Sequence, residues 1–379
     1  MQYREFKKLG VKVSAFGLGC MRFPMIGEES NRHIDQELAT SIIRTVIDGG
    51  VNYVDTAYVY SDGTNERAVG QALRDGYREK VFLATKLPTL ACDTPEDLPR
   101  LFEEQCRNLE TDHIDFYLVH SLDRTKWDKV RALGVREFLT KLKAEGRIRF
   151  ACFSFHDNFD AFSYILNDYD WDMCQLQYNF MDIDHQAGRR GVELAGEKGI
   201  PVVIMEGLLG GKLANAPENV QALYDAYPVH RSPAEWGFRW LCNHKQVLTV
   251  LSGVTDLVQA KDNLRIFDEA TVGCMSREDL ELMDRVRDAY LSRTRVGCTG
   301  CRYCMPCPGG VDIPRVFSLW NSAFQYGRTL CGDMGYARLA KEGNGADKCL
   351  SCGKCERVCP QQLPIRQLMK EAQNEAKVK

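Results

Sequence analysis

The sequence has no run of about 18 consecutive apolar residues, the length that a membrane-spanning helix needs. Its first eight residues are mostly polar or charged, without the apolar stretch of a secretory signal peptide. It also has no large excess of either charge, because 49 Lys and Arg stand against 52 Asp and Glu. We therefore expect a cytoplasmic protein that binds neither a membrane nor a nucleic acid.

One common cofactor signature is also missing. Gly17-Leu18-Gly19 follows the first apolar stretch, but the third glycine of a Rossmann dinucleotide fingerprint does not follow it. The composition is otherwise that of a globular protein, with 44% hydrophobic and 27% charged residues. A length of 379 residues accommodates one barrel of about 250 residues and a smaller domain.

Short apolar stretches alternate with helical patterns over most of the chain. We predict eight strands, at residues 13–20, 51–55, 81–85, 114–120, 148–153, 173–177, 201–205 and 247–252. Helix starts between them are indicated by Asp35, by Thr94 before Pro95, and by Ser232 before Pro233. This alternation favours an α/β fold, a (β/α)8 TIM barrel, over an open doubly wound sheet.

After a further helix predicted at residues 276–295, the composition changes, and cysteine, glycine and proline become frequent. We therefore place a domain boundary between residues 295 and 296, with a barrel at 1–295 and a small, mainly helical domain at 296–379. Helical patterns at 314–327 and 334–341 lie between the two cysteine-rich stretches of this second domain.

Two cysteine runs are the most specific signal in the sequence. The second run fits C-x2-C-x2-C-x3-C-P, the bacterial ferredoxin pattern, and the first has one residue fewer before its fourth cysteine. In ferredoxins with two clusters, the fourth cysteine of a run ligates the other cluster. We therefore assign one [4Fe–4S] cluster to Cys298, Cys301, Cys304 and Cys359, and a second to Cys349, Cys352, Cys355 and Cys307. The alternative is zinc, whose ribbons use two C-x2-C pairs and stop at four ligands.

Three predicted strands of the barrel end close to a titratable residue: Asp55, Lys86 and His120. Tyr60 follows the first of them. In a barrel of parallel strands these ends meet at one mouth, where catalytic groups lie.

In this order and spacing, the Asp-Thr-Ala-Tyr-Val-Tyr sequence that begins at Asp55, the strand ending in Lys86 and the strand ending in His120 resemble the aldo-keto reductases over residues 1–295. The resemblance implies a catalytic tetrad of Asp55, Tyr60, Lys86 and His120 that acts with NAD(P)H. Tyr60 would donate a proton to the carbonyl oxygen, Lys86 would lower the pKa of Tyr60, and Asp55 would hold Lys86. His120 would hydrogen-bond the carbonyl oxygen.

The same resemblance implies a set of cofactor-binding residues: Gly19, Cys20, Met21, Ser154, Gln175, Met205 and Asn263. The pattern departs from the family at three places. Phe155 stands where an asparagine is usual, Met205 replaces a ring-stacking tyrosine, and Glu206 replaces a serine near the pyrophosphate. The stretch from residue 252 to 257 has no Arg or Lys for a 2′-phosphate. For these reasons a flavin is an alternative cofactor.

The sequence thus predicts an iron–sulfur oxidoreductase that reduces a carbonyl or oxidises an alcohol, with the clusters passing electrons. The fused architecture resembles ferredoxin-tailed aldo-keto reductases. A ferredoxin or flavodoxin is a candidate electron partner, since Lys348, Lys354 and Arg357 flank the second cysteine run. Two alternatives remain: an NADPH-dependent carbonyl reductase with structural clusters, and a non-enzymatic redox-sensing subunit.

Overall fold

The computed structural model describes residues 1–28 and 31–377. Its contacts divide the chain into two compact units, one of Met1–Gly210 with Ala234–Leu280 and one of Gly211–Pro233 with Glu281–Lys379. The second unit therefore includes a short insertion and residues 281–295 in addition to the cysteine-rich region. The domain boundary between residues 295 and 296 stays a prediction.

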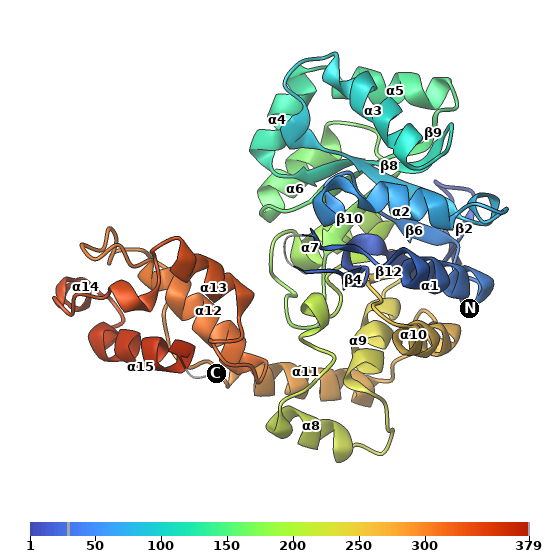
Figure 1. Ribbon diagram of the computed structural model, residues 1–379. Helices are drawn as coiled ribbons and strands as arrows, with labels where there is room; N and C mark the ends of the chain where they lie inside the picture. Colours follow the sequence, from blue (N-terminus) through green and yellow to red (C-terminus); the bar gives the residue numbers. More distant parts are fainter. Residues whose placement is uncertain (29–30, 378–379) are drawn as a thin grey trace. The chain divides into compact units, whose positions relative to one another are not determined.

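The first unit is a closed barrel of eight parallel strands (Figure 1). In chain order they are β3 (Phe16–Gly19), β6 (Tyr53–Asp55), β7 (Phe82–Leu87), β8 (Ile114–Leu122), β9 (Ile148–Phe155), β10 (Met173–Gln177), β11 (Val202–Met205) and β12 (Val247–Ser252). Each strand pairs with the next, and β12 closes on β3. All eight predicted strands are therefore confirmed, and with them the TIM barrel.

The predicted first strand is divided between two sheets. Lys12–Ser14 forms β2, which pairs antiparallel with β1 (Tyr3–Glu5), and the barrel strand β3 begins only at Phe16. Leu9 and Val13 of this hairpin belong to a buried apolar cluster with Tyr53 and Phe116 of the barrel strands. The hairpin thus packs on apolar side chains of the barrel. A second short ribbon joins β4 (Met25–Ile26) and β5 (His33–Ile34).

Helices connect the barrel strands and surround them (Figure 1). They are α1 (Gln36–Asp48), α2 (Asn65–Ala72), α3 (Asp97–Asn108), α4 (Arg124–Ala132), α5 (Val135–Ala144), α6 (Phe159–Asn167), α7 (Gly188–Glu197), α9 (Pro233–Cys242) and α10 (Leu257–Glu269). The cap predicted at Asp35 is confirmed, since its carboxylate accepts a hydrogen bond from the backbone of Leu38 at 3.0 Å. The cap predicted at Thr94 is wrong. The N-cap is Glu96, and the Asp97 carboxylate accepts the backbone N–H of Thr94 instead.

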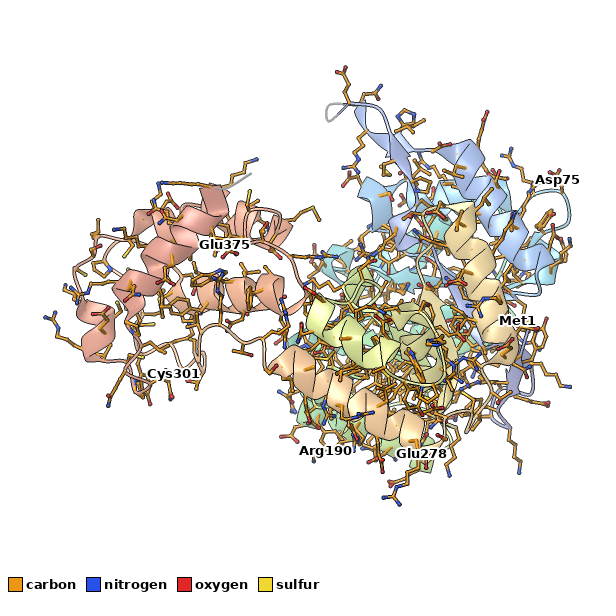
Figure 2. The ribbon with its side chains drawn as sticks, turned by 90° about the horizontal axis from the view of Figure 1, so that it is seen from below. Met1, Asp75, Arg190, Glu278, Cys301 and Glu375 are labelled. Carbon is orange, nitrogen blue, oxygen red and sulfur yellow. The ribbon has the colours of Figure 1, made fainter. Side chains whose placement is uncertain are left out.

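The second unit is helical. It contains α8 (Glu218–Asp225), most of α11 (Arg277–Leu291), α12 (Ile313–Gln325), α13 (Met334–Lys341), α14 (Lys354–Arg357) and α15 (Ile365–Lys377). Its buried core includes Phe317 and Trp320 of α12 and Met369 of α15. The Glu375 carboxylate accepts hydrogen bonds from the Trp320 indole at 2.9 Å and from the Leu330 backbone at 3.2 Å. Figure 2 labels Glu375 on its helix and Cys301 in an irregular stretch of the same unit.

The short 3-10 helices mark loops. They are Cys20–Arg22, Tyr60–Gly63, Arg78–Lys80, Thr89–Ala91, Leu209–Gly211 and Ala346–Lys348. In the described part of the chain, no helix combines the length and the apolar character that crossing a membrane requires.

Candidate active site

Three of the four predicted catalytic residues lie on three neighbouring strands, and the fourth follows one of them. Asp55 ends β6, Lys86 lies near the end of β7, and His120 lies near the end of β8. Tyr60 begins the 3-10 helix that follows β6. Because these strands are parallel and adjacent, the four side chains come together at the carboxyl end of the barrel.

The Lys86 ammonium contacts both Asp55 and Tyr60. Its Nζ lies 2.6 Å from Oδ1 of Asp55, 2.7 Å from the carbonyl oxygen of Thr56 and 3.4 Å from the hydroxyl of Tyr60. The rings of Tyr60 and His120 are 6.1 Å apart. The other nearby tyrosine, Tyr58, instead donates its hydroxyl to Glu104 at 3.0 Å. The structure therefore brings Tyr60, and not Tyr58, to Lys86.

Burial sets the proton affinities of these groups. Burial alone would lower the pKa of Lys86, but Asp55 and Tyr60 together raise it above its usual value, so Lys86 carries its charge. Burial raises the pKa of Tyr60, and Lys86 opposes this effect without cancelling it. Lys86 thus lowers the pKa of Tyr60 as expected, but burial raises this pKa by more. The Tyr60 hydroxyl keeps its proton, as a proton donor must.

His120 is neutral at physiological pH. Burial lowers its pKa to about 3, and the charges of Lys86, His156 and Lys126 act in the same direction. A neutral imidazole offers one N–H donor and one acceptor nitrogen. It can hydrogen-bond a carbonyl oxygen without competing with Tyr60 as the acid.

Asn65 holds the loop that carries Tyr60, a role that the sequence analysis missed. Its side chain is buried, accepts a hydrogen bond from Thr56 Oγ1 at 2.7 Å and donates to the carbonyl oxygen of Cys20 at 2.9 Å. It also donates to Ser61 Oγ at 3.3 Å, and Ser61 has a φ of 48°. Asn65 thus ties the segments after β3 and β6 to the loop of Tyr60.

A buried polar network lies behind Lys86. Gln105 Nε2 donates to the carbonyl oxygen of Lys86 at 3.0 Å and to Glu66 Oε1 at 2.8 Å. Glu66 also accepts the hydroxyl of Thr85 at 2.6 Å, and both side chains are fully buried. These bonds fix the backbone of β7 at Lys86 and satisfy the buried carboxylate.

Two of the predicted cofactor-binding residues fit a carboxamide group. Ser154 Oγ accepts the backbone N–H of Ser121 at 2.7 Å, so its own hydroxyl hydrogen remains for another acceptor. Gln175 is 1% exposed, and its Oε1 has no hydrogen-bond partner among the described residues. A buried amide oxygen without a donor is the partner that a carboxamide NH2 would satisfy. Phe155 is fully buried against Phe162, with ring centroids 5.3 Å apart, and takes no part.

The other predicted cofactor contacts divide into four kinds. Gly19 ends β3 opposite Asp55, and Met205 ends β11, so both lie at the carboxyl end of the barrel. Cys20 is fully buried, and burial raises its pKa well above the usual value, as for a packed thiol. Met21 is 53% exposed. Asn263 is buried and donates to Ser252 Oγ at 2.9 Å, so it already has a protein partner.

Arg22 is a further candidate that the sequence analysis missed. A Cβ built on Gly210 would lie 2.7 Å from an Arg22 guanidinium nitrogen and 3.7 Å from Glu206 Oε2. A Cβ on Gly253 would meet the stem of the same arginine at 3.3 Å. Arg22 therefore lies between the loops that follow β11 and β12. Its cation stands close to Glu206, the group expected to repel a pyrophosphate.

The cysteines of the second unit gather as predicted for one set. Cys298, Cys301, Cys304 and Cys359 line one pocket, together with Ile313, Phe317 and Leu363. Burial raises the pKa of the Cys304 thiol, and three neighbouring thiols raise it further: Cys298, Cys301 and Cys359. In the second set, burial raises the pKa of the Cys355 thiol, and Cys307 raises it further. Four thiols around an apolar cavity fit the core of an iron–sulfur cluster.

No three His, Cys, Asp or Glu side chains within residues 1–28 and 31–377 lie close enough together to hold a single metal ion. The cysteines outside the two runs include Cys92, Cys106, Cys152, Cys174 and Cys242, which are buried. These side chains are therefore part of the packing.

Comparison with protein families identifies both units. Residues 15–286 match the aldo/keto reductase family. Residues 297–363 match the family described as a 4Fe-4S dicluster domain. The first match covers most of the chain, and the second covers both cysteine runs.

Two curated relatives come from Bacillus subtilis (strain 168). The chain is 33% identical over 149 residues to the uncharacterized oxidoreductase YrpG, and 31% identical over 163 residues to the aldo-keto reductase YhdN. These matches cover 34% and 36% of this chain, and 43% and 47% of the relatives. The chain thus spans less than half the length of the curated relatives it matches.

Solved structures share the barrel fold. The holo form of aldo-keto reductase AKR11C1 from Bacillus halodurans superposes with a TM-score of 0.63 at 25% identity, over 76% of this chain and 96% of that one. An aldo/keto reductase from Klebsiella pneumoniae, solved in complex with NADP and acetate, has a TM-score of 0.59 at 24% identity, over 74% and 94% of the two chains.

Proposed function

This chain belongs to the aldo/keto reductase family and carries a 4Fe-4S dicluster domain, and we propose that it reduces a carbonyl, or oxidises the alcohol, with Tyr60 as the proton donor. The observation that carries the proposal is the buried Lys86, which bridges Asp55 at 2.6 Å and the hydroxyl of Tyr60 at 3.4 Å. Reduction of a carbonyl adds a hydride to carbon and a proton to oxygen. The four converging residues would act on the proton transfer to this oxygen.

Each residue has one task in this proposal. Tyr60 donates its hydroxyl proton to the oxygen as negative charge develops there. Lys86, next to that hydroxyl, stabilises the phenolate that remains. Asp55 keeps Lys86 charged and oriented. His120, neutral and close to Tyr60, donates a hydrogen bond that positions the oxygen.

We propose NAD(P)H as the hydride source, and a flavin is the alternative. Ser154 and Gln175 would hold the nicotinamide carboxamide, because a free hydroxyl hydrogen and an unpaired amide oxygen match its two ends. Met205 would pack on the ring with its thioether. Arg22 would offset Glu206 and contact the phosphates, since it lies between the two loops nearest to them. The nicotinamide, when bound, supplies the hydride.

We propose two [4Fe–4S] clusters in the second unit, held by the two interleaved cysteine sets given above. Clusters carry single electrons. A carbonyl needs two electrons at once, so the barrel still needs a two-electron carrier. A structural role for the clusters and a redox-sensing role for the whole chain are the alternatives. The converging Asp55, Tyr60, Lys86 and His120 favour an enzyme over a sensor.

An acidic ferredoxin or flavodoxin is the proposed electron partner. Lys354 and Arg357 lie on α14, within the second cysteine run, whereas Lys348 is paired with Asp347 at 3.2 Å. We propose a cytoplasmic location, because thiols stay reduced there. Added salt should slow electron transfer from reduced ferredoxin if the two cations steer docking.

The function is tested on protein purified without air. Iron is counted per chain, and reduction of an activated ketone is followed with NADPH and, separately, with reduced ferredoxin and NADP⁺, the two-electron carrier that the barrel needs. We expect reduction with NADPH, and with ferredoxin only when the clusters are present. Intact clusters that pass no electrons from reduced ferredoxin to the ketone would favour a structural role for the clusters. Flavin bands in the absorption spectrum would show that the hydride carrier is a flavin and not a nicotinamide. Failure to reduce any carbonyl would overturn the proposal.

A further inference from the structure

A chain of hydrogen bonds runs along the barrel mouth from Asp182 to His156. Asp182 Oδ2 accepts from Gln177 Nε2 at 2.9 Å. Gln186 Nε2 lies 3.4 Å from Gln177 Oε1 and 3.3 Å from His156 Nδ1. The four residues come from the end of β9, the end of β10 and the loop after β10, all within the barrel unit.

This chain fixes which nitrogen of His156 carries the proton. A carboxylate only accepts, so Gln177 must present its NH2 group to Asp182 and its oxygen to Gln186. Gln186 therefore presents its NH2 group to both Gln177 and His156 Nδ1. Since Nδ1 accepts, the neutral imidazole carries its hydrogen on Nε2. His156 is exposed, so this Nε2–H is a donor at the surface of the mouth.

His156 lies beside the catalytic histidine. Its backbone N–H donates to the carbonyl oxygen of Leu122 at 2.8 Å, and Leu122 pairs with Phe155 where β8 and β9 end. His120 is two residues before Leu122 on β8. Burial does most to lower the pKa of His120, and the charges of Lys86, His156 and Lys126 lower it further.

Lys126 adds a cation to the same place. Its Nζ donates to the carbonyl oxygen of Ser121 at 2.9 Å and lies 2.9 Å from Asp123 Oδ2. An ammonium has three N–H donors, so one remains. The Lys126 side chain is 25% exposed. Of the nearby acids, Asp123 also caps α4 through the Lys126 N–H, Asp157 accepts the backbone N–H of Arg124, and Asp182 is held by Gln177 and Asn179.

We propose that His156 and Lys126 form a subsite for an anionic group, a carboxylate or a phosphate, on the carbonyl substrate. A carbonyl oxygen bound by Tyr60 and His120 places the rest of a short substrate at this edge of the mouth. There the His156 Nε2–H and the remaining Lys126 N–H donate hydrogen bonds to the anionic group of the substrate. This inference rests on the proposed function and names its substrate class.

The test compares matched substrates with the holoenzyme. Succinic semialdehyde is paired with butanal, and glyceraldehyde 3-phosphate with glyceraldehyde. We expect kcat/KM to favour the charged member of at least one pair by about tenfold or more, since hydrogen bonds to charged groups contribute that much. The pair that shows the preference identifies the anion. Equal kcat/KM values within both pairs would overturn the subsite while leaving the proposed function intact.

Variants assign the effect to the subsite. In His156→Ala, the ratio of kcat/KM for the charged substrate to kcat/KM for the neutral substrate should fall close to one. The value for the neutral substrate should change by less than about threefold. His156→Gln, which keeps an N–H donor, should retain part of the preference for the charged substrate. Gln186→Leu should reduce the preference, because the hydrogen-bond chain then no longer fixes the His156 proton. His113→Ala is the matched control, since His113 lies before the amino end of β8 and pairs with Asp112.

A binding measurement keeps the two proposals apart. Calorimetry with succinate and with inorganic phosphate on the anaerobic holoprotein needs no turnover. Binding that is lost in His156→Ala and kept in His113→Ala supports the subsite even if no carbonyl is reduced. Equal binding to the wild type and His156→Ala, or none of either anion to the wild type, would refute it.

Discussion

The Lys86 ammonium lies 2.6 Å from Oδ1 of Asp55, and the two side chains are 1% and 2% exposed. Asp55 Oδ2 is buried without a hydrogen-bond partner in the described part of the chain. An ion pair this deeply buried gains little stability over apolar side chains of equal volume, and loss of one partner is costly. Its position beside the Tyr60 hydroxyl is the basis of the role that we propose for it.

Removal of Lys86 should therefore affect both stability and activity. Lys86→Met leaves the Asp55 charge unpaired, and we expect the barrel unit to lose about 3 kcal/mol of unfolding free energy. The double variant Asp55→Asn with Lys86→Met should recover part of this loss but no carbonyl reduction. Chemical denaturation and a ketone assay measure the two effects. A double variant as unstable as the single one would show that charge imbalance is not the cause.

His120 should couple stability to pH in a defined direction. Its folded pKa of about 3 lies below the ordinary value of 6.5, so below pH 6.5 the unfolded chain binds a proton that the folded chain does not. Folding stability then falls as pH falls, by about 1.4 kcal/mol per unit below 6.5 from this group.

His120→Gln should remove that share of the pH dependence between pH 7.5 and 5.5, measured by unfolding at each pH. His113→Ala provides the comparison with an exposed histidine. Parallel stability curves for wild type and His120→Gln would show that His120 titrates normally in the folded protein.

The cysteine assignment predicts a specific pattern of cluster loss. We expect about eight irons per chain, falling to about four in Cys352→Ser. Cys359→Ser should disturb the cluster of Cys298, Cys301 and Cys304, although it belongs to the other run. Cys92→Ser, which changes a buried thiol of the barrel, is the control. Zinc at two ions per chain in anaerobic protein would contradict the assignment.

Arg22 should affect cofactor affinity more than turnover. Arg22→Ala leaves Glu206 facing the phosphates without a nearby cation, so the dissociation constant of NADPH should rise about tenfold or more, with kcat little changed. Glu206→Ser should lower the dissociation constant of NADPH. Fluorescence titration of NADPH measures both. An unchanged affinity in Arg22→Ala would place the phosphates elsewhere.

The sequence predicted the barrel well because its strands are short apolar stretches separated by helix signals. It failed where two local signals competed. At Thr94 the cap was misplaced because the Thr94 hydroxyl donates to the Asp97 carboxylate, which also accepts the Thr94 backbone N–H, and the helix begins only after Glu96. The first strand was overextended because Val13 of β2 and Phe16 of β3 are apolar and close in sequence, and only the different partners of the two strands separate them.

The candidate catalytic residues were predictable because Asp55, Lys86 and His120 lie at or near the ends of recognisable strands, and Tyr60 follows the first of them. Arg22 and the chain from Asp182 to His156 were not. Arg22 is defined by its contacts with Gly210 and Gly253, and the role of Gln186 by its contacts with Gln177 and His156. The net pKa of Tyr60 also depends on burial, which outweighs the charge of Lys86.

Removal of one hydroxyl tests the central claim most directly. Tyr60→Phe and Tyr58→Phe are compared by kcat/KM for an activated ketone and by the dissociation constant of NADPH. If Tyr60 is the proton donor, its loss should lower kcat/KM by about 100-fold or more and leave NADPH affinity within about twofold. Tyr58→Phe, which loses only the bond to Glu104, should retain most of the activity. Equal losses in the two variants, or full activity in Tyr60→Phe, would contradict the account.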